Sequence, residues 1–411
     1  MIVNEGSLQY HGWKIVAVCF VMAMFSFGLG YYGHGVYLAE LTTRDSSVAM
    51  RFTTSTVSAA TTAYYLVSAC LVLFVSNAIS RFGARLVAMT GAVALAASLL
   101  LIARVRSPVD LFVAYLTMSV SWATLTNAAI SNILGLWFSS KRGCALSLAL
   151  NGGSIGGILA APLLVWGIGK APFSTVLDVA AAVVLLGLVP VIALWMDRPS
   201  NDKPAASAGA SPTSAARPVT RRAVLRTAHF WTIAAPFALA IMAQVGFIVH
   251  QIAFLLPKIG REGASLAVML MTTMAVVGRF GLGFYVDRLD QRRAASILLA
   301  NQAAALLLLI YADTPSVIYL ASALFGLSVG NVITLPVLLV QREYDAASFG
   351  VLAALVVSII QMTFALGPAL IGVLRDLTGQ YTTSLMVCVT LELLAAAIVL
   401  IRIRPTRAAQ T

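Results

Sequence analysis

Arg279 is the residue of this sequence whose chemistry fits its surroundings least. It lies in the apolar run 266–286, which carries no other charge before Asp287. A guanidinium in the hydrocarbon layer of a membrane costs several kcal/mol, and arginine cannot lower that cost by losing its proton. We expect such a charge to face a water-filled cavity or an anionic partner. A buried acid is the alternative partner, and the main candidates are Glu392, Asp178 and Glu40.

Two histidines in apolar surroundings, His34 and His250, are the next candidates for chemistry. Histidine changes charge near neutral pH, so each could act as a proton-linked switch or donate a hydrogen bond to an anion. Further polar and aromatic residues could line a binding cavity, although Asn and Gln also bond helices to each other. They are Tyr31, Tyr32, Tyr64, Tyr65, Asn127, Gln251, Asn331 and Gln361.

The elements that position these residues follow from the composition. The chain has 411 residues, of which 60% are hydrophobic and 10% charged, and its mean hydropathy is +0.92. A soluble protein would carry about 25% charged residues. Apolar blocks of about 20 residues, the length that crosses a bilayer, recur along the whole chain and predict an all-α polytopic membrane protein. We expect twelve spans, at approximately 13–39, 55–79, 86–105, 109–134, 143–168, 173–196, 229–257, 264–286, 294–312, 315–340, 348–374 and 379–403.

The segment between the sixth and seventh spans divides the chain into two equal parts. Residues 198–226 are rich in Pro, Ala and Ser and predict a flexible cytoplasmic linker. We therefore expect two six-helix bundles, 1–197 and 227–411, with a substrate site at mid-membrane between them, as in two-fold repeat transporters. Most of the 27 Lys and Arg residues then fall on one side of the membrane, which places both termini in the cytoplasm. Topology thus explains the net charge of +12 better than nucleic-acid binding does.

A loop motif between spans eight and nine supports this interpretation. It contains Gly283, Asp287, Arg288 and the pair Arg292-Arg293. This order resembles the G-x-x-x-D-R-x-x-x-R-R signature of the major facilitator superfamily. A glycine allows two helices to approach, the aspartate can pair with nearby basic groups, and the arginines hold the loop on the cytoplasmic side. We expect the motif to act as a latch that breaks and reforms during transport.

The corresponding loop of the first half, between spans two and three, repeats the motif in part. Arg81, Gly83 and Arg85 fit the pattern, but Ser76 replaces the first glycine and Ser80 replaces the aspartate. We expect Arg81 and Arg85 to contribute to the latch on this side.

Two further segments resemble the monocarboxylate-transporter branch of the superfamily. Trp137-Phe138 and the basic pair Lys141-Arg142, which we also assign to the latch, precede small residues at the start of span five. Gly12-Trp13 opens span one as in that branch, without its preceding acidic residue.

This resemblance gives Arg279 a role. Relatives carry an arginine in span eight, followed shortly by glycine, as in Arg279-Phe-Gly281, and this arginine is thought to hold the substrate carboxylate. A bidentate guanidinium–carboxylate pair explains the choice of arginine over lysine. Many mammalian relatives place an aspartate that is linked to proton coupling one turn earlier, where this chain has Ala275.

The sequence therefore predicts a secondary transporter of a small organic monocarboxylate or dicarboxylate. We expect a multi-pass protein of the inner (plasma) membrane that works as a monomer in the lipid bilayer, with a proton as a candidate co-substrate. The four cysteines show no metal or disulfide spacing, and no motif indicates a cofactor or an enzyme. An exporter of drugs or other amphipathic compounds is the alternative, although it would favour an acidic cavity. Glu392 receives no function.

Overall fold

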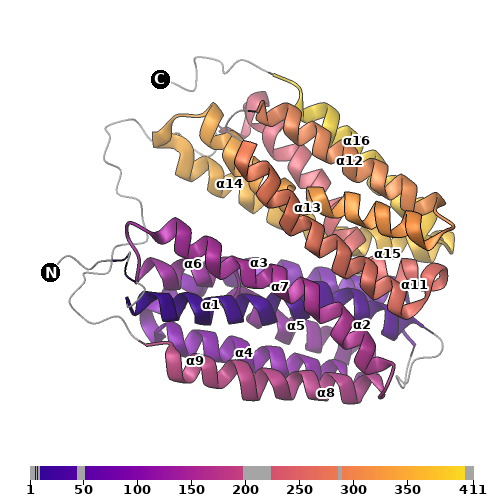
Figure 1. Cartoon of the computed structure of the whole chain (residues 1–411), viewed down its shortest axis with the longest axis horizontal. Coiled ribbons are helices and arrows are strands. Elements are labelled where there is room, and N and C mark those ends of the chain that lie inside the picture. Colours follow the sequence, from indigo (N-terminus) through magenta and orange to yellow (C-terminus); the bar gives the residue numbers. More distant parts are fainter. Residues whose placement is uncertain are drawn as a thin grey trace. The chain divides into compact units, whose positions relative to one another are not determined.

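The computed structural model describes residues 5, 7, 10–43, 51–197, 224–285 and 289–402. Every regular element within these ranges is a helix. Eleven of the described helical segments are long and apolar enough to cross a membrane. The chain separates into two compact units, Met1–Ala208 and Gly209–Thr411 (Figure 1). The predicted linker, 198–226, lies mostly outside the described residues, so its conformation stays a prediction.

The first unit contains six membrane-crossing segments, several of which are built from more than one helix. In chain order, its helices are α1 (Gly12–Phe27), η1 (Gly28–Tyr32), α2 (Gly33–Thr42), α3 (Thr54–Phe82), α4 (Ala84–Ile102), α5 (Pro108–Leu125), α6 (Asn127–Gly135), α7 (Arg142–Ile168), α8 (Phe173–Val183), η2 (Val184–Leu188) and α9 (Val189–Trp195). The first segment runs without interruption from Gly12 to Thr42, and η1 is a π-helical turn within it. Helix α1 packs closely against α7, and α5 packs against α3 and α4.

The second unit has the same number of segments once its longest helix is divided. Its helices are α11 (Ala228–Tyr285), α12 (Gln291–Tyr311), α13 (Pro315–Glu343), α14 (Ala346–Phe364), α15 (Gly367–Thr378) and α16 (Tyr381–Val399). Within α11 the backbone of Gly260 leaves the helical region, with φ 72° and ψ 178°. Glycine adopts a positive φ without steric cost, so Gly260 separates the predicted spans seven and eight. The all-α polytopic fold predicted from the apolar blocks is confirmed.

Both units use glycine to bring the backbones of their first and fifth spans into contact. A Cβ on Gly156 of α7 would overlap the Met24 carbonyl oxygen and lie 2.9 Å from the Gly28 nitrogen. In the second unit, a Cβ on Gly367 of α15 would overlap the Met242 carbonyl oxygen and lie 2.9 Å from the Gly246 nitrogen. Small residues allow this close approach in membrane helices. The same close contact between first and fifth spans therefore occurs in each half of the chain.

The outer surfaces of the helices carry large apolar side chains. Leu73 on α3, Leu186 on η2 and Leu377 on α15 expose three quarters or more of their surface. An exposed apolar surface of this extent would be a liability in water but suits hydrocarbon. The backbone polar groups of these segments are bonded within the helices, as a lipid environment requires.

Candidate functional site

Arg279 lies on the part of α11 that follows Gly260, where this helix packs against α13. Its side chain is half-buried, and its guanidinium lies over Gly330 of α13. A Cβ on Gly330 would lie 3.1 Å from Arg279 Nε, 3.2 Å from Nη2 and 2.7 Å from the Ala275 carbonyl oxygen. The absence of a side chain at Gly330 thus makes room for the guanidinium.

The helix contact that surrounds this place is equally close. A Cβ on Gly326 would overlap the Met271 carbonyl oxygen, and a Cβ on Gly278 would overlap the Leu327 carbonyl oxygen. The buried Asn331 donates its amide hydrogen to the Leu327 carbonyl oxygen within α13, at 3.1 Å. Sequence analysis identified Arg279 and Asn331, and the structure places them on facing helices of one unit.

His250, on the first part of α11, is fully buried and joins three helices. Its Nε2 lies 3.1 Å from the Pro368 carbonyl oxygen of α15, and its Nδ1 lies 3.3 Å from the Tyr381 hydroxyl of α16. Because a carbonyl only accepts, Nε2 carries the proton; in the neutral ring Nδ1 then accepts from Tyr381. The neighbouring Gln251 is also fully buried, and its amide atoms have no hydrogen-bond partner among the described residues.

His34, on α2 of the first unit, lies in an aromatic environment. Its ring centroid is 4.8 Å from that of Tyr64 and 5.3 Å from that of Tyr115, with which it stacks. The ring is fully buried, and neither nitrogen has a hydrogen-bond partner within the described ranges. The rings of Tyr65 and Tyr37 also lie around His34, with centroids 5.9 Å and 6.0 Å from that of the imidazole.

The predicted tyrosines converge on Trp122 of α5, which the sequence analysis did not single out. Its ring centroid lies 5.9 Å from that of Tyr31, 6.1 Å from Tyr64 and 6.0 Å from Tyr65. The Tyr64 hydroxyl donates to the Gly30 carbonyl oxygen at 2.6 Å. The ring of Tyr32 packs against Gly157 of α7. The sequence feature that could have identified Trp122 is the presence of a tryptophan among the small and polar residues 119–126.

The two remaining cavity candidates lie apart from these clusters. Asn127 is exposed and begins α6, whereas Gln361 is half-buried on α14. Their binding roles stay predictions.

The latch residues are only partly within the described structure. Asp287 and Arg288 lie outside the described residues, and Gly283 lies near the end of α11. Arg81 and Arg85 are exposed, and Arg81 lies over the Phe82 ring at 5.3 Å. Lys141 is exposed directly before α7, and Arg142 donates to the Ser131 carbonyl oxygen at 3.2 Å. The latch itself stays a prediction.

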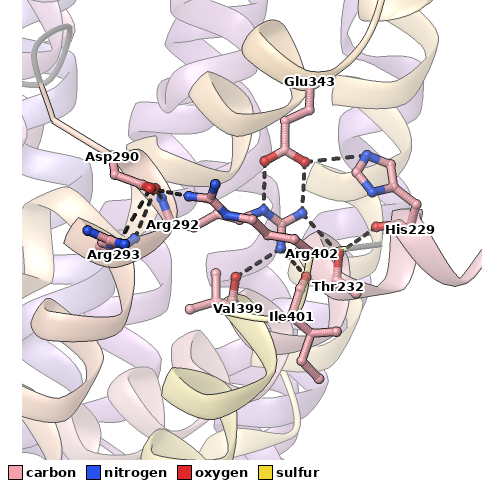
Figure 2. Close-up of polar contacts among 9 residues, drawn as sticks. All are labelled: His229, Thr232, Asp290, Arg292, Arg293, Glu343, Val399, Ile401 and Arg402. Carbon is pink, nitrogen blue, oxygen red and sulfur yellow. Dashed lines mark hydrogen bonds and ion pairs between the residues drawn. The ribbon is translucent and has the colours of Figure 1, made fainter. Parts of the chain in front are cut away.

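A buried ion pair beside this loop is the main feature that sequence analysis missed. The sequence places Arg292 among the loop arginines, but its residue surface is only 3% exposed. Its Nε donates to Glu343 Oε1 at 2.6 Å and its Nη2 donates to Glu343 Oε2 at 2.7 Å (Figure 2). His229 Nε2 lies 3.3 Å from the same Glu343 Oε2. The carboxylate therefore lies between two basic side chains.

The other hydrogens of the Arg292 guanidinium also find acceptors. Nη1 donates to the Val399 and Ile401 carbonyl oxygens, both at 2.8 Å, and Nη2 donates to Thr232 Oγ1 at 3.0 Å. With the two bonds to Glu343, all five N–H groups of the guanidinium are used. Arg292 therefore joins the starts of α11 and α12 to the ends of α13 and α16.

Next to this pair, Asp290 accepts from the backbone N–H groups of Arg292 and Arg293 and thereby caps α12. It also pairs with Arg402 (Figure 2). Desolvation raises the pKa of Asp290, but the backbone bond from Arg293 and the pairing with Arg402 outweigh it and hold that pKa below its usual range. This carboxylate remains charged and favourable at the positive end of the helix.

Glu5 connects the start of the chain to the residues that precede α7. Its carboxylate accepts from the backbone N–H groups of Ser139, Ser140 and Lys141, at 2.9 to 3.0 Å, and from both serine hydroxyls at 2.7 Å. Burial alone would raise the pKa of Glu5, but these bonds lower it to about 2.

The aromatic residues that follow Glu5 reinforce this contact. The Trp13 and Tyr10 rings pack on Phe138, with centroids 5.1 Å and 5.3 Å away. The two segments that carry the monocarboxylate-transporter resemblance are therefore in direct contact.

Glu392 on α16 is fully buried, and neither carboxylate oxygen has a hydrogen-bond partner among the described residues. The structure supplies no function for it.

Comparison with known proteins identifies the family. A sequence model of the Major Facilitator Superfamily matches residues 15–368. The chain belongs to the major facilitator superfamily. It is thus a multi-pass membrane transporter and not an enzyme, as the sequence predicted.

Individual major facilitators resemble the chain to different degrees. Monocarboxylate transporter 13 of Bos taurus is 27% identical over 323 residues, which are 76% of this chain and 72% of that protein. The crystal structure of the nucleoside transporter NupG (D323A mutant) matches with a TM-score of 0.76 at 13% identity, over 95% of this chain and 98% of that one. A bacterial homologue of the human lysosomal transporter Spinster matches with a TM-score of 0.69 at 12% identity, over 96% and 97%. At such identities the two structures show the shared fold alone.

Proposed function

We propose that this major facilitator transports a small organic monocarboxylate or dicarboxylate by alternating access, and that Arg279 binds the carboxylate. The observation that carries this proposal is the position of Arg279, a permanent cation held half-buried against Gly330 in an apolar helix. The similarity to a protein named as a monocarboxylate transporter supports the same substrate class.

The chemistry follows from the guanidinium. A carboxylate can take two parallel hydrogen bonds from it, which are stronger than neutral ones. In a site of low dielectric this attraction exceeds what the same pair would have in water. Bound substrate would neutralise the charge of Arg279, so occupancy would lower the barrier to reorientation of the transporter.

We further propose that the protein acts as a monomer in the inner (plasma) membrane and that a proton is its co-substrate. Ala275 stands where many relatives carry the acid linked to proton coupling. His34 and His250 are therefore the residues to which we assign the response to pH.

Uptake into proteoliposomes tests the substrate class. Labelled small monocarboxylates and dicarboxylates, their uncharged amides and a cationic amphipathic drug would be compared, with and without an imposed pH gradient. Arg279→Ala and Arg279→Lys are expected to lower carboxylate uptake by roughly 30-fold or more, because truncating one partner of a desolvated charge pair costs 2 kcal/mol or more. Arg106→Lys is the matched control, because Arg106 is exposed and has no assigned role.

Two outcomes would contradict the proposal. Unchanged carboxylate uptake by both Arg279 variants would exclude this arginine as the binding group. Transport of the drug, without transport of any carboxylate, would favour an exporter of amphipathic compounds.

A further inference from the structure

Gly330 is in contact with the guanidinium of Arg279, although the two residues lie on different helices. Its missing Cβ would meet two nitrogens of that group, at 3.1 Å and 3.2 Å, and the Ala275 carbonyl oxygen at 2.7 Å. Contacts of side-chain atoms at 3.1 to 3.2 Å are tighter than ordinary packing, so a methyl group at position 330 would require the guanidinium to move.

The backbone on the other side of Gly330 cannot yield in the same way. Ala275 lies in the middle of α11, and its carbonyl oxygen takes part in the helix. Gly326, one turn earlier on α13, holds the helices together by a similar contact with the Met271 carbonyl oxygen. Close packing of this kind transmits strain rather than absorbing it. A methyl group at position 330 would therefore strain the helix contact at the Ala275 carbonyl oxygen and also displace the flexible end of Arg279.

The position of the guanidinium determines how it can meet an anion. Arg279 Nε is shielded from solvent, whereas the residue as a whole is half-buried. The terminal Nη1/Nη2 pair of a guanidinium can donate two parallel hydrogen bonds to one carboxylate. Fixing this end in one place lowers the entropy cost of binding.

We infer that Gly330 is a positioning residue for substrate binding, because the space left by its missing side chain lets the Arg279 guanidinium lie against α13, where it meets the carboxylate. This inference rests on the proposed role of Arg279. It adds a residue of α13 that affects substrate binding, although α13 has no charged residue next to Gly330.

A set of glycine variants tests the inference by uptake. Gly330→Ala is expected to raise the KM for the carboxylate roughly tenfold, the loss that follows when a charge-assisted hydrogen bond is misplaced. Gly326→Ala introduces a backbone clash on the same helix without touching Arg279, so it should alter Vmax or the yield of folded protein and leave KM within about twofold. Gly350→Ala is the neutral control, because a Cβ there meets nothing within 4 Å.

A double variant separates displacement of Arg279 from a general packing defect. Lysine lacks the Nε and Nη2 groups that face Gly330, so Gly330→Ala should have little further effect on KM in the Arg279→Lys background. Arg279→Lys should also recover part of the unfolding temperature that Gly330→Ala loses, and none of what Gly326→Ala loses. This second measurement needs no transport and applies even if Gly330→Ala folds poorly.

Four results decide the matter. Equal KM shifts in Gly326→Ala and Gly330→Ala would overturn the inference, as would a loss of stability on Gly330→Ala that Arg279→Lys does not relieve. If Gly330→Ala transports normally while Arg279→Lys does not, the inference fails and the proposed function stands. If Arg279→Lys and Arg279→Ala both transport normally, the proposed function fails, and relief of the stability loss alone would then establish the contact.

Discussion

The guanidinium of Arg292 and the carboxylate of Glu343 form a bidentate ion pair, with bonds of 2.6 Å and 2.7 Å between residues 51 positions apart. Four helices of the second unit end or begin at this pair. Breaking a buried pair leaves an uncompensated charge, whereas replacing both partners with apolar residues often costs little. The pair is therefore expected to be sensitive to single substitutions.

Glu343→Ala or Arg292→Ala should each destabilise the protein by about 3 to 5 kcal/mol, because each leaves the other charge buried. The double variant Arg292→Met/Glu343→Leu should lose less than either single variant. Thermal unfolding in detergent, monitored by intrinsic fluorescence, provides the measurement. Arg293→Ala is the control and should change stability by no more than about 0.5 kcal/mol, because an exposed ion pair contributes little. A double variant that loses the sum of the single losses would contradict this account.

The bonds of Glu5 predict a dependence of stability on acid pH. The pKa of Glu5 falls from 4.5 to about 2 on folding, so its contribution is complete above pH 4.5 and is lost as the pH falls from there towards 2. Glu5→Gln should be less stable than the native protein at pH 7 by about 1.5 to 3 kcal/mol, since hydrogen bonds to a charged group contribute that much.

The same stability measurement at lower pH shows whether the contribution of Glu5 is lost in acid. Unfolding temperatures of the native protein and of Glu5→Gln should converge as the pH approaches 3. Glu262→Gln, which removes an exposed carboxylate of α11, should keep a constant difference from the native protein. Curves of native and Glu5→Gln protein that stay parallel down to pH 3 would show that Glu5 is not the titrating group.

Ala275 offers a second test of the Arg279 site. An aspartate at this buried position would lie one helical turn before Arg279, where opposite charges pair. In Ala275→Asp, uptake near neutral pH should fall by about tenfold, because the new carboxylate competes with the substrate, and it should recover in acid when that group is protonated. Ala275→Asn has the same size without the charge and should not acquire this pH profile. Identical pH profiles for the two variants would argue against Arg279 as the anion site.

The sequence predicted the helical fold well because crossing a bilayer imposes a minimum apolar length on every span. Even the division of α11 agrees with the predicted end of span seven and start of span eight, and Gly260 lies between them. Periodicity could not reveal the π-helical turn at Gly28–Tyr32, since the insertion of one residue does not alter the apolar character of the span.

The site was only partly predictable, because the missing relationships connect residues that are distant in sequence. Arg279 was conspicuous from its local surroundings alone, whereas its contact with Gly330 depends on how α11 meets α13. Arg292 looked like an ordinary loop arginine, and only the fold brings Glu343 and the end of α16 to it. Glu5 lies 134 residues before Ser139, so its contact with residues 139–141 had no local signal either.

The π-helical turn of the first span has a consequence for how such proteins can change. The backbone N–H of Gly33 bonds to the Gly28 carbonyl oxygen, so this turn holds one residue more than an α-helical turn. Loss of a single residue here would restore regular winding and rotate everything beyond it by about 100°. His34 would leave its place among the tyrosines, and another side chain would enter. A deletion of three nucleotides could thus replace His34 by another side chain at this buried position of the first unit, without any substitution.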